Sequence, residues 1–306
     1  STSTVKGPAW DEKSHRQHKT MRDHVRVLFR QKAILLITMF LVPASVYLAL
    51  ELNTPVYETS VKMLLSAKKQ IASPFYGDLQ HLQSDAVLTE SEIVKSGPVL
   101  NRVVDALQLH TRPLDYESKF ASPIRQAVIQ WEIQKDQAFL DTMDPEERMQ
   151  FRRLQAIEQL RENIRVEPIR QTKLFNVIVS SFDPAEAAQL ANIVSRSYVT
   201  FDLEQQLAEL RIKYTDRHLA VTQLQEYIDF MKQSLHGEDL SNIDAIGPAS
   251  VKIVEQALEP LLPIGAPKKT TFVLSVIFGV VLGVLLAYLF ENLDQSFKSR
   301  QIWKHF

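Results

Sequence analysis

Cysteine is absent from the 306 residues of this chain. In an oxidising compartment this absence excludes disulfide bonds, so a folded domain must depend on its own core or on partners. It also removes the thiol as a nucleophile. The length is typical of about two domains and permits a substantial core.

Sequence motifs of catalysis are also absent. The chain contains no G-x-x-x-x-G-K-[ST], G-x-S-x-G or H-E-x-x-H motif. Its eight histidines are scattered, and His15 with His18 has no further ligand at metal-binding spacing. No pair of carboxylates is set apart by its spacing as an acid/base dyad. We therefore expect no enzyme activity, and no catalytic, cofactor-binding or metal-binding residue.

Charged residues are missing from two long apolar runs, residues 33–50 and 271–290. A helix of about 20 apolar residues crosses the roughly 30 Å hydrocarbon core of a bilayer. We therefore predict transmembrane helices at 33–52 and 271–290. Pro43 lies inside the first run, where a membrane helix tolerates it as a kink. The alternatives are a cleaved signal peptide for the first run and buried core helices for both.

The charges that flank the two runs predict the orientation in the membrane. Residues 1–32 form a basic arm with a net charge of +5, the tail at 291–306 carries +1, and residues 51–270 carry −7. Short basic flanks stay in the cytoplasm, whereas long domains are translocated regardless of charge. Both termini are therefore expected in the cytoplasm, with the middle of the chain outside. The nearly neutral total of −1 gives no reason to expect nucleic-acid binding.

The middle segment, residues 53–270, shows the patterns of an α+β domain. Residues 56–69, 164–168, 174–182 and 251–260 have strand-like composition, and apolar spacing predicts helices near 93–107, 122–137 and 148–165. A break is expected at 96–98, where Pro98 suits the first turn of a new helix, and Asp144 with Pro145 suits another helix start. Residues 73–82 and 237–250 are expected to be irregular.

A long helix is predicted at about 184–236. Asp183 and Pro184 are typical of a helix start, and neither Gly nor Pro follows until Gly237. Such a helix would be about 75 Å long and would extend beyond a single core. Its partial apolar stripe, which includes Phe201 and Leu210, would then need a neighbour, and this indicates a homo-oligomer.

Glycine and proline mark the second apolar run and its approach. Gly279 and Gly283 are four residues apart, so they form a flat strip on one helix face that permits close packing. We expect this strip to pack against the first membrane helix or a neighbouring subunit. Pro260, Pro263 and Pro267 predict an extended connection that leads into the helix at Lys268.

Three stretches together resemble the polysaccharide co-polymerases, a family that includes the Wzz chain-length determinants and the membrane part of bacterial tyrosine-kinase exopolysaccharide regulators. The first is FRQKAILLITMFLVPASVYLALELNTPVYETSVKMLLSA, a basic flank, an apolar run and a strand. The second is KLFNVIVSSFDPAEAAQLANIVSRSYV, which contains Ala188 and Asn192. The third is ALEPLLPIGAPKKTTFVLSVIFGVVLGVLLAYLFENLDQSFKS.

The resemblance implies a periplasmic α+β base, a long protruding helix and rings of subunits in the bacterial inner membrane. It implies a role in the chain length of O-antigen, capsule or exopolysaccharide, with a polymerase or glycosyltransferase as partner. An export adaptor linked to an outer-membrane channel is the alternative; a two-span sensor and a membrane-anchored enzyme were weighed and are less favoured. Kinase-bearing relatives continue past ENLDQSFKS, so phosphotransfer would need a separate cytoplasmic tyrosine kinase.

Overall fold

The computed structural model describes residues 31–65, 89–235, 250–265 and 267–301. One unit contains the apolar helices from the two ends of the chain, and the other is the domain at Glu51–Gly265. Four predictions concern segments outside the described residues: the basic arm, the end of the first strand, most of the two irregular segments and the end of the C-terminal tail.

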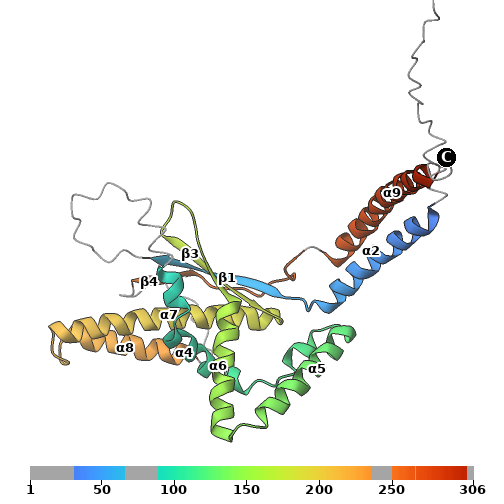
Figure 1. Cartoon of the computed structure of the whole chain (residues 1–306). Helices are drawn as coiled ribbons and strands as arrows, with labels where there is room; N and C mark the ends of the chain where they lie inside the picture. Colours follow the sequence, from blue (N-terminus) through green and yellow to red (C-terminus); the bar gives the residue numbers. More distant parts are fainter. Residues whose placement is uncertain (1–30, 66–88, 236–249, 266, 302–306) are drawn as a thin grey trace, which may run out of the picture. The chain divides into compact units, whose positions relative to one another are not determined.

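The first unit consists of α2, Lys32–Leu52, and α9, Lys268–Gln301, so both predicted apolar helices are present (Figure 1). Pro43 lies inside α2 as expected. Only 6% of the most apolar window of α2 and 22% of that of α9 are buried. Most side chains of both helices are therefore exposed although they are apolar, which differs from the core helices of soluble proteins.

The domain at Glu51–Gly265 is built on a four-stranded antiparallel sheet with the order β2-β3-β1-β4. The strands are β1, Tyr57–Leu65; β2, Ile164–Pro168; β3, Leu174–Ser181; and β4, Val251–Glu255. The sequence predicted all four, although β4 ends five residues early. Alternate residues of β3 are buried, so one face of the sheet lies on the core.

The core lies between this sheet and α7, Pro184–Lys213. Val61 of β1 pairs with Val177 of β3, and both are fully buried. The facing side of α7 is rich in alanine and aliphatic residues, and its fully buried Tyr198 contacts Phe175 edge to face at 6.5 Å. Small residues permit the close approach of helix and sheet, and each fully buried large side chain contributes about 1.5–3 kcal/mol.

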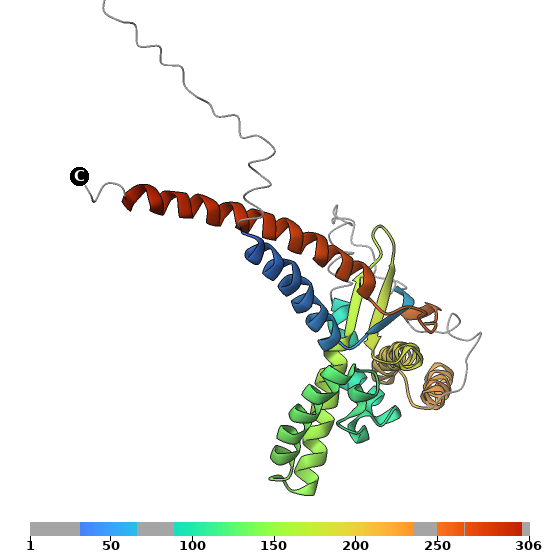
Figure 2. The same ribbon diagram turned by 90° about the vertical axis from the view of Figure 1, so that its right-hand side faces the viewer.

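The prediction of one helix at about 184–236 is wrong, because the chain turns at residues 214–218. A second helix, α8, Leu219–Ser234, folds back along α7 (Figures 1 and 2). Tyr214 leaves the helix in an extended conformation and stacks on His218, whose side chain accepts a hydrogen bond from the Ala220 N–H. The turn buries Leu224 and the other apolar residues of α8 against α7. This burial outweighs the propensity to continue one solvated helix.

Three further helices complete the domain: α4, Gly97–Ala106; α5, Pro123–Leu140; and α6, Pro145–Asn163. Residues 89–94 are also helical, and Pro98 lies in the first turn of α4 as predicted. Asp144 occupies the N-cap position of α6 but makes no side-chain capping hydrogen bond. Phe139 of α5 and Phe151 of α6 are in edge-to-face contact at 5.7 Å.

Candidate functional site

The two apolar helices pack through a seam of small residues on α9. Gly279 and Gly283 belong to this seam, which consists of every fourth residue and is completed by Ser275 and Ala287. A Cβ atom added to Gly279 would lie 3.3 Å from the backbone oxygen of Thr38 and 3.4 Å from Cδ of Pro43.

The seam of α9 meets the buried face of α2. Thr38 and Pro43 are the buried residues of α2, and a Cβ atom on Gly283 would overlap the Thr38 hydroxyl oxygen. That hydroxyl donates to the backbone oxygens of Ile34 and Leu35, at 2.9 and 3.1 Å, so its polar group is satisfied within α2. The structure thus places the glycine strip against the first apolar helix. Sequence reasoning missed Ser275 and Ala287, although they continue the same four-residue spacing.

The proline-rich approach to α9 is fixed to the domain by three contacts. The side chain of Asn192 makes two hydrogen bonds to the backbone of Ala257: its Nδ2 donates to the oxygen at 3.1 Å, and its Oδ1 accepts from the N–H at 2.9 Å. The Thr59 hydroxyl donates to the Leu258 oxygen at 2.7 Å. The Ile264 N–H donates to the Val56 oxygen at 2.7 Å. The segment thus follows β1 after β4 has ended.

The prolines of this approach explain why the strand does not continue. Pro260 and Pro263 have no N–H to donate to a sheet ladder. Pro260 is half-buried, whereas Pro263, Pro267 and Lys268 are exposed. Lys268 is the first residue of α9.

The residues expected to pack the long helix lie inside one subunit. Asp183 caps α7 by accepting a hydrogen bond from the Ala185 N–H at 3.1 Å, and Pro184 is its first residue. Ala188 is buried, and Phe201 and Leu210 are partly buried against the core. Each therefore has a packing or capping role within the fold, and their contact with a second subunit stays a prediction.

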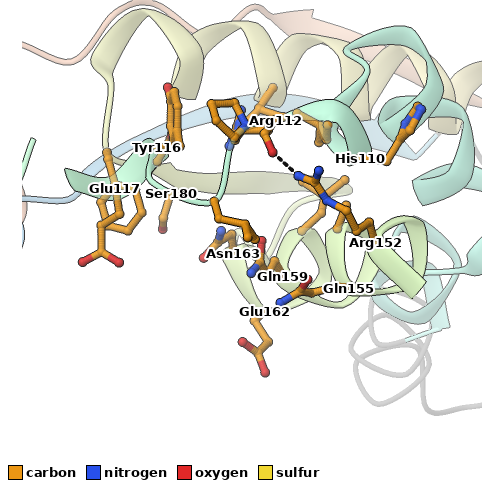
Figure 3. Close-up of a pocket in the computed structure, with 18 of the residues that line it drawn as sticks. His110, Arg112, Tyr116, Glu117, Arg152, Gln155, Gln159, Glu162, Asn163 and Ser180 are labelled. Atoms are coloured by element: carbon orange, nitrogen blue, oxygen red, sulfur yellow. Dashed lines mark hydrogen bonds between the residues drawn. The ribbon is translucent and has the colours of Figure 1, made fainter. Parts of the chain in front are cut away.

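A polar cavity of about 360 Å³ lies in the domain between α6, residues 109–117 and the end of β3 (Figure 3). Arg152, Gln155, Gln159 and Asn163 of α6 line it at spacings of three or four residues, so they share one face of the helix. Figure 3 shows the Arg152 guanidinium directed at the backbone oxygen of Arg112, to which it donates a hydrogen bond.

Glu186 organises the wall of the cavity near the start of α7. It forms an ion pair with Arg112 and accepts hydrogen bonds from the Tyr116 hydroxyl, at 2.8 Å, and from the Ser181 hydroxyl. The Arg112 guanidinium also lies 4.0 Å from the centre of the Tyr116 ring. Burial lowers the pKa of Arg112 and raises the pKa of Tyr116.

The cavity is suited to binding a polar ligand, because its arginines are neutralised by internal partners while the α6 amides offer donors and acceptors. Sequence reasoning missed it. The helical spacing of the polar residues on α6 is also typical of a solvated surface, and only their position opposite residues 109–117 distinguishes the two. Within the described residues, no group of three metal-ligating side chains occurs.

Comparison with known proteins adds one likeness. No protein-family profile and no curated protein matches this sequence. Among solved structures, the chain is similar to one described as a "full-length bacterial polysaccharide co-polymerase", with 12% sequence identity and a TM-score of 0.36. The similarity covers 90% of this chain and 99% of the other. Because both values are low, the function is argued below from the residues of this chain.

Proposed function

We propose that this protein is a non-catalytic polysaccharide co-polymerase of the bacterial inner membrane. In this proposal α2 and α9 span the membrane, both termini are cytoplasmic, and the α+β domain lies in the periplasm. The carrying observation is the pairing of two exposed apolar helices through the small-residue seam, with the whole domain between them. An exposed apolar surface of this extent is stable in lipid rather than in water.

The contact between α2 and α9 also favours two permanent anchors over a cleaved signal peptide. Removal of α2 would expose Gly279 and Gly283 and leave the seam without its partner. Pro43 at the contact supports this, because a proline inside a helix requires close neighbours to compensate for the lost backbone hydrogen bond.

The proposed activity is regulation of the chain length of a surface polysaccharide, such as O-antigen, capsule or exopolysaccharide. Copies of the chain would assemble in the membrane and bias how long a polymerase or glycosyltransferase extends a lipid-linked glycan. Since α8 covers α7 within one subunit, assembly would use surfaces other than the face of α7 that α8 buries. The sequence resemblance supplies the class of function, and the geometry supplies the anchored scaffold that it requires.

Gene deletion tests this function directly. The surface glycan of the deletion strain is separated on a gel beside strains complemented with the wild-type gene or with Gly283→Leu. We expect a changed length distribution that only the wild-type gene restores fully. Full-length glycan retained inside the cell would favour the export adaptor, and an unchanged glycan would refute the proposal. Mass photometry of the detergent-extracted protein should find a multimer.

A further inference from the structure

Three leucines on the approach to α9 are far more exposed than leucine usually is. Leu258, Leu261 and Leu262 are 79%, 94% and 80% exposed, and Ile264 is 50% exposed. They lie within seven residues of one another, immediately before the apolar helix. Soluble domains rarely leave such a cluster in water, so this cluster requires an apolar environment outside the domain.

The leucines are held outward by a fixed backbone. Upstream, the Asn192 amide pairs with Ala257, and the Thr59 hydroxyl donates to the Leu258 oxygen. Downstream, the Ile264 N–H donates to the Val56 oxygen. The segment is therefore anchored on both sides of Leu261 and Leu262, and these side chains are not at a free chain end.

The position of the segment in the chain identifies what covers it. The hydrogen bond between Ile264 and Val56 joins the two connections to the apolar helices: Val56 is four residues after Leu52, and Ile264 is four residues before Lys268. A residue spans at most about 3.6 Å, so each connection reaches no more than about 14 Å from its helix. This distance is comparable with the interfacial zone of a bilayer, where apolar side chains insert beside the headgroups.

Two further features favour lipid over another protein surface. Lys268 and Lys269 follow the leucines and are exposed, which suits contact with lipid phosphates. The other connections of these strands leave from the opposite end of the sheet, where Leu65 of β1 pairs with Val251 of β4. They therefore start one strand length away from the leucines.

We propose that Leu258, Leu261, Leu262 and Ile264 insert into the boundary between headgroups and acyl chains of the bilayer. They form an interfacial anchor that fixes the height of the α+β domain above the membrane. The inference rests on the two-span topology proposed above, and it adds a lipid-binding surface to the domain itself.

The absence of cysteine allows a site-specific test in the full chain. Leu261→Cys and Leu262→Cys variants are labelled with an environment-sensitive fluorophore and reconstituted in nanodiscs of phosphatidylcholine and phosphatidylglycerol. Identical nanodiscs contain lipids brominated either near the headgroup or deep in the acyl chain. Ile212→Cys, at a residue 86% exposed on α7, is the matched aqueous control, and Phe278→Cys on α9 reports the membrane helix.

We expect blue-shifted emission from labels at 261 and 262, with most of it lost in the headgroup-brominated lipid. The label at 212 should stay red-shifted and unquenched. Labels at 261 and 262 that are unquenched and red-shifted would overturn the anchor, and labels that are blue-shifted but unquenched would overturn it by assigning the surface to a second protein copy. Deep quenching at 278 keeps the membrane helices independent of either result, whereas its loss would refute the topology.

Discussion

Replacement of Asn192 by alanine should detach the segment that leads from β4 to the second apolar helix. The Asn192 amide makes two hydrogen bonds to the backbone of Ala257, a residue only 6% exposed. Each bond contributes about 0.5–1.5 kcal/mol net, and a buried backbone group left without a partner costs about 1–3 kcal/mol. We expect Asn192→Ala to lower the free energy of unfolding by about 2–3 kcal/mol, which corresponds to roughly 4–12 °C in a domain of this size.

Thermal unfolding of the full chain in nanodiscs, followed by circular dichroism, measures this loss. Gln225→Ala is the control, because the Gln225 amide is exposed and bonds to Asp229 within the same helix. We expect its unfolding free energy to stay within about 0.5 kcal/mol of the wild type. If Asn192→Ala behaves like Gln225→Ala, the amide pair does not hold the segment.

Asn192→Asp separates the two bonds of the amide pair. An aspartate keeps an acceptor for the Ala257 N–H but places a carboxylate oxygen against the Ala257 oxygen. Protonation converts that oxygen into a donor, so this variant should gain stability relative to Asn192→Ala as the pH falls toward 4. A constant difference between the two variants across this pH range would contradict the proposed geometry.

Three further variants test other contacts. Gly283→Leu should destabilise the pairing of α2 and α9 by about 1–3 kcal/mol, because its side chain overlaps Thr38, and reduced cross-linking between cysteines placed in the two helices should be restored by Thr38→Gly. Burial opposes ionisation of Glu204, but hydrogen bonds and charges from Lys232 and Arg102 prevail and lower its pKa. Its stabilisation should therefore be complete above about pH 4.5 and be lost as the pH falls through its folded-state pKa, so Glu204→Gln should show a smaller acid-induced drop in melting temperature than wild type; an identical drop would argue against this ion pair. Leu224→Ala should cost about 2–5 kcal/mol because Leu224 is 5% exposed between α8 and α7, whereas Leu219→Ala, at a residue 68% exposed, should change unfolding little; equal losses would contradict the helical hairpin.

The strands were predictable because their signals are local. Alternation over residues 174–182 and β-forming composition at 56–69 identified β3 and β1, and Asp183 with Pro184 identified the start of α7. The turn at 214–218 was not predictable from Gly or Pro, which are absent there. Its cause is tertiary, since α8 buries its apolar stripe by folding back on α7.

The candidate site was only partly predictable. Gly279 and Gly283 indicated one face of α9, but their partners Thr38 and Pro43 follow from the pairing of distant segments. Asn192 was noticed through the family resemblance, and its role became apparent only beside Ala257, 65 residues later in the sequence. Contacts of this separation carry no local periodicity, so a single sequence does not reveal them.

The two-span arrangement is best tested by labelling in intact cells. Lys119→Cys and Arg217→Cys each give the otherwise cysteine-free chain one thiol in the α+β domain. With the outer membrane permeabilised and the inner membrane intact, a membrane-impermeant maleimide should label both variants. Labelling that occurs only after the inner membrane is disrupted would place the domain in the cytoplasm and contradict the proposed topology.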